Sequence, residues 1–312
     1  MTTHHYTSLC LCSNWPSRTR LDRVLAQLFS AHTRAALQAL ISSGAVCVNG
    51  VECRRQAQLV NAGQEINIDF SRLPQVHDEN CDAENIPLRV VYEDDDIVVV
   101  NKAAGMVIHP GHGNRTGTVQ AALLYRHPPA AALPRAGIVH RLDKDTSGLF
   151  VAAKTEVARQ SLIEQFKSRQ AGREYLALVC GAPAATGLIN RALSPKRGAQ
   201  ARMNVVHSGG KEAVTRYAVL RRWPGFALLR CWLETGRTHQ IRAHLEYAGY
   251  PIIGDPVYQR RARCQDFFIS RQALHAETLR LIHPVRVDEC CWSCPLPDDM
   301  QAVIAQLDAV CT

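Results

Sequence analysis

The sequence has no apolar run long enough to cross a bilayer. None of its 312 residues belongs to a stretch near the roughly 20 apolar residues that a membrane-spanning helix needs. Residues 1–14 also lack the basic segment and apolar stretch of a secretion signal, and internal repeats and low-complexity tracts are missing. We therefore expect a cytoplasmic protein of one large domain or two unequal ones, with ample length for a hydrophobic core.

Recognisable metal and nucleotide motifs are absent as well. Twelve cysteines are scattered along the chain, but Cys291 and Cys294 form a single CxxC with no second pair to complete a zinc site. His239 and His244 lie five residues apart and lack the glutamate of a zinc-protease helix. Glycine-rich residues 111–117 fit neither the P-loop nor the dinucleotide fingerprint. We expect reduced thiols, no metal and no cofactor.

The charge, in contrast, is plentiful and uneven. The formal net charge is +8. Residues 1–70 carry 6 basic and 4 acidic side chains, residues 71–96 carry 2 and 8, and residues 97–312 carry 28 and 16, which gives +2, −6 and +12. A basic body with a short acidic segment favours a polyanionic partner, most simply a nucleic acid.

The first part of the chain has the pattern of a small module. Apolar residues recur at helical spacing in "RLDRVLAQLF" and "TRAALQALISSG", which predicts two short helices, the second with Thr33 as N-cap and Gly44 as C-cap. Asn49-Gly50 between two short apolar runs predicts a β-hairpin. We assign residues 18–70 to this module, residues 1–17 to a disordered tail and residues 71–85 to an acidic linker.

From residue 86 the pattern changes to longer elements. "LRVVYEDDDIVVVNK" predicts a hairpin, and "REYLALVCG", "VTRYAVLRRW" and "FALLRCWLETG" predict strands. "TVQAALLYR", "VARQSLIEQFKSR" and "HQIRAHLEYAG" predict helices between them. We therefore expect residues 86–312 to form one α+β domain on a mixed, mostly antiparallel β-sheet with flanking helices.

The segment "AGIVHRLDKDTSGLFVAAKT" (136–155) begins and ends with apolar residues around a charged loop, His140–Gly148. The segments "GIVHRLDKDTSGL", "REYLALV", "LETGRTHQIRAH", "GYPIIGDPVY" and "RQALHAETLRLIHP" resemble, in order and spacing, those of the RluA-type pseudouridine synthases. Residues 20–69 resemble the alpha-L RNA-binding module that often precedes that domain. The likeness starts near residue 18 and departs from the family at Ala103, where a proline is usual.

The resemblance implies that the protein isomerises uridine to pseudouridine in RNA, without metal or cofactor, after flipping the base out of its stack. The closest likeness is to family members that modify large-subunit ribosomal RNA, free or in assembling or assembled subunits. Within that RNA it points to the helix 69 stem-loop. We take the protein to be a monomer. Local residues support RNA as the partner better than they support one target site.

Asp143 matches the essential aspartate of the family. A carboxylate can attack the anomeric carbon of the sugar, or it can remove the proton at the 2′ carbon to give a glycal, and the sequence leaves both open. Arg242 matches the arginine that pairs with the aspartate, and an arginine there would offset the cost of a charged carboxylate in a dry site. Alone, Asp143 would more often be a helix cap or a loop ion pair.

The same resemblance assigns the other site residues. Tyr175 would stack on the uracil and could carry the carbon-5 proton, with Ile241 as the opposite wall. Arg141 would enter the stack as the uridine leaves it. His140 and Thr146 are substrate-binding candidates, although a packing role is the alternative for His140.

In the small module, six side chains could contact the RNA backbone as a group, and each one singly could equally be an ordinary exposed residue. They are Arg23, His32, Thr33, Arg34, Asn49 and Arg54.

Two functions of other classes compete with the isomerase. A non-catalytic RNA-binding or ribosome-assembly factor would keep the fold without the chemistry, and the joint presence of Asp143, Tyr175 and Arg242 argues against it. A metal-dependent hydrolase would need carboxylates or histidines at ligand spacing, which the sequence lacks.

Overall fold

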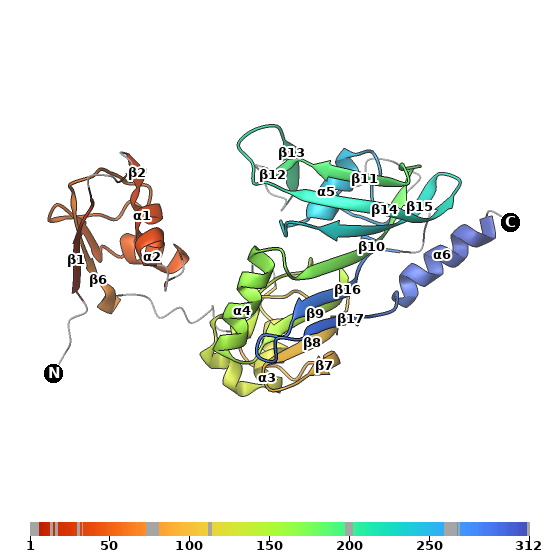
Figure 1. Ribbon diagram of the computed structural model, residues 1–312, viewed down its shortest axis with the longest axis horizontal. Helices are drawn as coiled ribbons and strands as arrows, with labels where there is room; N and C mark the ends of the chain where they lie inside the picture. Colours follow the sequence, from red (N-terminus) through yellow and green to blue (C-terminus); the bar gives the residue numbers. More distant parts are fainter. Residues whose placement is uncertain are drawn as a thin grey trace. The chain divides into compact units, whose positions relative to one another are not determined.

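The computed structural model describes residues 6–12, 15, 18–29, 32, 34–72, 81–111, 114–196, 202–258, 267 and 269–310. The chain divides into two compact units, Met1–Asn80 and Cys81–Thr312 (Figure 1). The division falls inside the predicted linker, of which residues 73–80 lie outside the described part. Residues 81–85 belong to the second unit, because the Glu84 backbone N–H donates to the Ala121 carbonyl at 3.1 Å.

The first unit packs two helices on a small antiparallel sheet of strand order β1-β6-β3-β4, with a separate β2-β5 pair. Its apolar residues at helical spacing, among them Leu21, Leu25 and Leu37, are fully buried in one core, as their periodicity predicts. The elements are β1 (Tyr6–Cys10), β2 (Thr19–Arg20), α1 (Leu21–Leu28), α2 (Arg34–Ser42), β3 (Val46–Val48), β4 (Val51–Glu52), β5 (Leu59–Val60), β6 (Glu65–Asp69) and the 3₁₀ helix η1 (Phe70–Arg72).

Two local predictions in this unit are confirmed. After α2, the backbone N–H of Gly44 (φ +79°) donates to Ile41 at 3.0 Å and that of Ala45 donates to Leu40 at 3.2 Å, the Schellman pattern for which glycine is suited. Asn49 and Gly50 both have positive φ between β3 and β4, as a two-residue type I′ hairpin requires. Thr33, the predicted N-cap, lies outside the described residues.

The prediction that residues 1–17 form a disordered tail is wrong for Tyr6–Cys10. These residues form β1, which pairs antiparallel with β6, Tyr6 opposite Asp69 and Cys10 opposite Glu65. Without β1, β6 would be an edge strand with unpaired backbone groups. The partner lies some 60 residues further along the chain, so local pattern alone does not indicate the pairing.

The second unit has the predicted α+β architecture. Its described residues form β7 (Arg89–Glu93), β8 (Ile97–Lys102), α3 (Val119–Arg126), η2 (Pro128–Ala132), η3 (Pro134–Gly137), β9 (Ser147–Ala153), α4 (Glu156–Lys167), β10 (Gly172–Cys180), β11 (Thr186–Asn190), β12 (Ala192–Pro195), β13 (Met203–Val206), β14 (Val214–Trp223), β15 (Phe226–Leu233), α5 (Gln240–Tyr247), β16 (Leu274–Ile282), β17 (Glu289–Ser293) and α6 (Asp298–Val310).

The strands of this unit form one mixed sheet in the order β11-β14-β15-β10-β16-β9-β8-β7, with β17 also on β16 and a separate β12-β13 hairpin. The β16–β9 pair is parallel, whereas the other named strand pairs of the sheet are antiparallel. Figure 1 shows α3 and α4 at the β7–β9 end and α5 at the β14–β15 end. The mixed, mostly antiparallel sheet with flanking helices is therefore confirmed.

Both faces of the central strands are buried. On one face, Val98 and Val100 of β8 belong to the large core that includes side chains of α3, α5 and α6. On the other face, Ile97 and Val99 pack with Leu162 of α4. A central strand covered on both sides is apolar at every position, which explains the uninterrupted run in "IVVV".

Among the described helices, none has the length and apolar character to cross a membrane. The described cysteines are free thiols except Cys180, which is disulfide-bonded. The expectation of reduced thiols is therefore wrong for this residue.

Candidate active site

Asp143 lies in the loop of residues 139–146, directly before β9. Gly148, the second residue of β9, has φ +113°, and a Cβ there would collide with the Ala276 carbonyl oxygen of β16. Glycine alone permits both the left-handed backbone and the close approach of the parallel strand. The end of the loop is therefore held at the centre of the sheet.

A buried lysine connects the loop that carries Asp143 to the end of β8. Lys102, at the end of β8, is 1% exposed, and its Nζ donates to the carbonyls of Ala103, Met106 and Lys144 at 2.8, 2.9 and 2.9 Å. Burial lowers the pKa of Lys102 to about 7, a shift that nearby aspartates partly oppose. Because the bond to residue 103 uses its carbonyl, Ala103 can replace the proline usual in the family without losing this contact.

A buried arginine binds the backbone of Asp145, in the same loop. Arg271 donates from Nη1 to the Asp145 carbonyl at 3.0 Å, and its Nε and Nη2 donate to the Asp299 carboxylate of α6 at 2.6 and 2.7 Å. Such a bidentate pair fixes the plane of the guanidinium. The loop that carries Asp143 is thus linked to the C-terminal helix.

Asp143 itself pairs with a preorganised arginine. Nη1 of Arg242, on α5, donates to Asp143 Oδ2 at 3.1 Å, while Nε and Nη2 donate to Asp255 at 2.7 and 2.9 Å. Asp255 is fully buried and also accepts from the backbone N–H groups of Val257 and Tyr258. The Asp255 carboxylate therefore aims the guanidinium, and one N–H edge is left for Asp143.

The ionic state of this arginine is well defined. Burial alone would lower the pKa of Arg242, but the hydrogen bonds and charges of Asp255 and Asp143 raise it. The guanidinium stays positive, and a fixed positive charge in a partly dry site stabilises negative charge on the neighbouring carboxylate.

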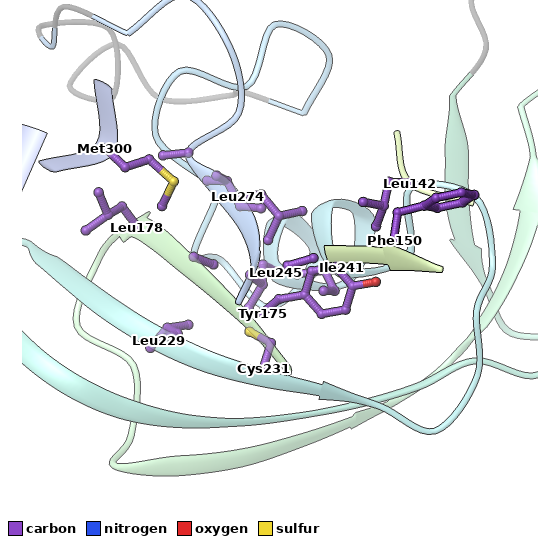
Figure 2. Packing of buried hydrophobic residues seen from close by; sticks show 14 of the residues in the cluster. Leu142, Phe150, Tyr175, Leu178, Leu229, Cys231, Ile241, Leu245, Leu274 and Met300 are labelled. Atoms are coloured by element: carbon purple, nitrogen blue, oxygen red, sulfur yellow. The ribbon is translucent and has the colours of Figure 1, made fainter. Parts of the chain in front are cut away.

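An aromatic and an aliphatic side chain supply apolar walls. Tyr175 of β10 is 4% exposed and Ile241 of α5 is 3% exposed, and both line the same pocket as Asp143. Figure 2 shows the Tyr175 ring among Ile241, Leu245 and Leu274. Burial raises the pKa of the Tyr175 hydroxyl, so it remains neutral at physiological pH.

These residues line one pocket that is partly open to solvent. Apolar walls with a few converging charged groups are typical of a ligand site. The lining consists of Arg141, Leu142, Asp143, Thr146, Arg173, Tyr175, Leu233, Gly236, Arg237, Thr238, His239, Gln240, Ile241, Arg242 and Leu274.

Six of the seven residues predicted for the catalytic domain therefore meet at one place, and His140 does not. Its Nε2 accepts from the Val151 backbone N–H at 3.0 Å, and its ring packs on Phe150 and Phe166 with centroids 4.5 and 4.7 Å away. The structure thus does not support His140 as a substrate contact. Thr146 lines the pocket and accepts from Gln272 at 3.2 Å.

Several pocket and support residues were not singled out from the sequence as site residues, although they lie in or beside the quoted motifs. Arg173 precedes Tyr175 by two positions, and Asp255 belongs to "GYPIIGDPVY". In the sequence, His239 stands out only as one of two histidines that lack metal-ligand spacing. Their position within those motifs is the one sequence feature that could indicate them. Local pattern does not show which side chain of a motif faces a pocket.

Four of the six predicted RNA contacts of the first unit have partners within that unit. Arg34 pairs with buried Asp22, and Arg54 pairs with Glu52 on the surface. Asn49 accepts from the Glu65 backbone N–H at 2.8 Å. His32 stacks on Phe70, Arg23 is exposed, and Thr33 lies outside the described residues.

One group in the described residues has ligand atoms close enough to hold a metal: Asp94, Asp96 and His283. Asp94 Oδ2 already accepts from Arg286 at 2.9 Å and is 2.7 Å from His283 Nε2. Burial alone would raise the pKa of Asp94, and its hydrogen bonds instead hold it well below the usual range. Asp94 thus connects the β7–β8 turn to the β16–β17 turn through a hydrogen bond with His283 and an ion pair with Arg286.

Comparison with known families gives two matches along the chain. Residues 19–66 match the S4 domain, and residues 96–247 match the RNA pseudouridylate synthase family. The second match contains Asp143, Tyr175 and Arg242, and the first covers both helices of the N-terminal unit.

Curated relatives extend the likeness to nearly the whole chain. The chain is 44% identical over 300 residues to the ribosomal large subunit pseudouridine synthase D of Salmonella typhimurium, covering 93% of this chain and 91% of that protein. It is 42% identical over 301 residues, with the same coverage, to the proteins of that name from Escherichia coli K12 and Haemophilus influenzae.

Solved structures agree. Human RNA pseudouridylate synthase domain containing 1 superposes with a TM-score of 0.56 at 26% identity, over 73% of this chain and 97% of that one. Human RNA pseudouridylate synthase domain containing 4 gives 0.57 at 26% identity, over 70% and 92%.

Proposed function

Because the chain belongs to the RluA-type pseudouridine synthases with an N-terminal S4 domain, we propose that it isomerises uridines of large-subunit ribosomal RNA, in the helix 69 stem-loop. The target class follows from the names of relatives at 42–44% identity. With that substrate, the place of action is the cytoplasm of a bacterium, and the protein works as a monomer on free RNA or on large subunits.

The observation that carries the proposal is the Asp143–Arg242 pair in the pocket. The reaction breaks the bond between uracil N1 and the sugar and joins carbon-5 to the anomeric carbon. Asp143 performs the sugar step, either by attack on the anomeric carbon or by removal of the 2′ proton. Arg242, aimed by Asp255, supports the charged carboxylate.

The remaining pocket residues bind the extruded nucleotide. Tyr175 stacks on the uracil and Ile241 closes the opposite side. Thr146, which lines the same pocket, also contacts the nucleotide. Arg141 is exposed at the pocket, where a planar cation can take the place of the departed base in the RNA stack. The S4 unit adds contacts to the RNA backbone through Arg23, His32, Thr33, Arg34, Asn49 and Arg54 as a group. Arg34 and Arg54 stay 47% and 66% exposed while paired with acidic side chains, so each can also reach a phosphate.

Site mapping tests the target. Large-subunit RNA, as transcript and as assembled subunits, is incubated with the wild-type protein in chelator, and pseudouridines are located by carbodiimide labelling and primer extension. We expect modification confined to the helix 69 stem-loop, and loss of it when the stem is unpaired by mutation. Modification elsewhere would refute the target, and RNA binding without modification of either substrate would favour the assembly-factor alternative.

A further inference from the structure

The isomerisation, as proposed above, includes the loss of a proton from carbon-5, for which the family resemblance offers Tyr175. When carbon-5 of the uracil joins the sugar, it still carries its hydrogen, and N1 lies in a C6=N1 double bond. Removal of the carbon-5 proton lets the C–H electron pair form C5=C6, and N1 then takes up a proton. A base near the ring accelerates such a step by roughly 10²–10⁴-fold.

Few side chains of the described pocket can accept a proton near neutral pH. Its arginines remain charged, and Tyr175, whose pKa burial raises, is a weak base in its neutral form. Asp143 is a free carboxylate again once carbon-5 has joined the sugar, so it is the competing acceptor, and unchanged tritium release in the variants below would assign the proton to it. Among the lining residues of the described chain, His239 is the remaining candidate.

The hydrogen bonds around Tyr258 favour one tautomer of His239. The Tyr258 hydroxyl donates its single proton to the Met203 carbonyl at 3.1 Å and accepts from the Met203 backbone N–H at 2.7 Å. His239 Nδ1 lies 3.2 Å from the same hydroxyl. With that proton on the Met203 carbonyl, the hydroxyl accepts from Nδ1–H, and in this tautomer Nε2 of the neutral ring carries the lone pair.

That lone pair is available. Nε2 of His239 has no hydrogen-bond partner in the described part of the protein and is not sealed from solvent, and the residue lines the pocket with Asp143 and Tyr175. A neutral imidazole nitrogen with an exposed lone pair is suited to general base catalysis.

The backbone holds this ring in an unusual position. His239 is the N-cap of α5 with φ +53° and ψ 23°, a left-handed conformation that is uncommon outside glycine and often stored at functional sites. Gln240, which is buried, fixes the turn: its Oε1 accepts from Thr235 and the Arg237 backbone at 2.7 and 3.0 Å, and its Nε2 donates to Val214 at 3.0 Å.

We propose that Nε2 of His239 accepts the carbon-5 proton of the rearranged uracil and that this proton, or one from water, is returned to N1. His239 is thus a second catalytic residue beside Asp143. The charged groups that face it are Asp143, Arg242, Asp255 and Arg141. Burial, the largest influence, lowers the pKa of His239, which keeps the base unprotonated at neutral pH.

The test uses the full-length protein with His239→Asn. Asparagine tolerates the left-handed backbone and can place its amide N–H where Nδ1–H donates to Tyr258, but it has no atom at the Nε2 position. His239→Gln serves as second variant, because its amide reaches that position without being basic. Circular dichroism and RNA affinity verify that each variant folds and binds.

Two single-turnover reactions then separate proton transfer from the earlier steps. Tritium release from RNA labelled at carbon-5 requires loss of that proton. Rearrangement of RNA that carries 5-fluorouridine at the target cannot lose a proton there, so it reports only bond cleavage and rejoining. We expect both variants to slow tritium release by roughly 10²–10⁴-fold and to change the 5-fluorouridine rearrangement by less than about threefold.

Other outcomes overturn the proposal. Equal slowing of both reactions would mean that His239 shapes the pocket, and unchanged tritium release would mean that another group takes the proton. If the wild type neither releases tritium nor rearranges 5-fluorouridine, the proposed function itself fails. The rate of the wild type should also fall at acid pH as His239 becomes protonated, and this dependence should be missing in His239→Gln.

Discussion

Substitution of Asp255 is the most direct test of how the site positions Arg242. Its carboxylate is fully buried and accepts two hydrogen bonds from Arg242, at 2.7 and 2.9 Å, while the side chain of Arg242 is 5% exposed. Asp255→Asn keeps the shape and one accepting oxygen but removes the charge and replaces the second oxygen by a donor. The guanidinium then has Asp143 as its one anionic partner within the described residues.

The structure sets the size of the effect. Removing one partner of a buried ion pair costs about 3–5 kcal/mol of folding free energy, and the oxygen that remains places this case near 3 kcal/mol. Catalysis falls because Arg242 is no longer aimed. If half of that energy is lost from the transition state, about 1.5 kcal/mol, the rate falls about tenfold.

Urea unfolding and single-turnover tritium release measure the two quantities. Asp299→Asn is the matched control, because Asp299 also binds an arginine through two hydrogen bonds but its side chain is 38% exposed. That loss should cost about 1 kcal/mol or less. Equal destabilisation by the two variants, or full activity in Asp255→Asn, would refute the view that burial of this carboxylate positions Arg242.

Three further predictions concern other parts of the molecule. Arg242→Met should lower the single-turnover rate far more than RNA affinity, since its partner is Asp143 and not a phosphate; a defect in affinity alone would contradict this. Burial depresses the pKa of Lys102 from 10.5 to about 7, so the folded state binds fewer protons than the unfolded state between these values. The stability of wild type relative to Lys102→Met should therefore rise with pH across that range, by up to about 1.4 kcal/mol per pH unit, and a constant difference in urea unfolding would contradict it. Removing residues 1–80 should weaken RNA binding and flatten its salt dependence; an unchanged slope would mean that the S4 unit makes no phosphate contacts.

Local sequence pattern predicts much of this fold. The helices that carry apolar residues at helical spacing, the Asn49-Gly50 hairpin and the strands of the catalytic unit form where the periodicity indicates, because each depends on neighbours in the chain. β1 does not follow from such a pattern. Its residues are ordered by pairing with β6, a contact between distant segments that local propensity does not encode.

Sequence likewise predicts one part of the active site and not the other. The motifs identify Asp143, Tyr175 and Arg242, and the structure brings them to one pocket. The contacts that hold the catalytic loop depend on the tertiary fold. Lys102 and Arg271 donate hydrogen bonds to backbone carbonyls of the loop, and no sequence motif indicates such contacts. His140 belongs to the same loop as Asp143, yet its ring packs in the core on Phe150 and Phe166, which the sequence alone does not indicate.

The central claim is that Asp143 does the chemistry in a pocket built to hold it. The direct measurement is tritium release from large-subunit RNA labelled at uracil carbon-5, in chelator, with wild type beside Asp143→Asn at equal occupancy of RNA. We predict release by the wild type and none by the variant, with RNA affinity retained. Multiple-turnover release by Asp143→Asn would contradict the account.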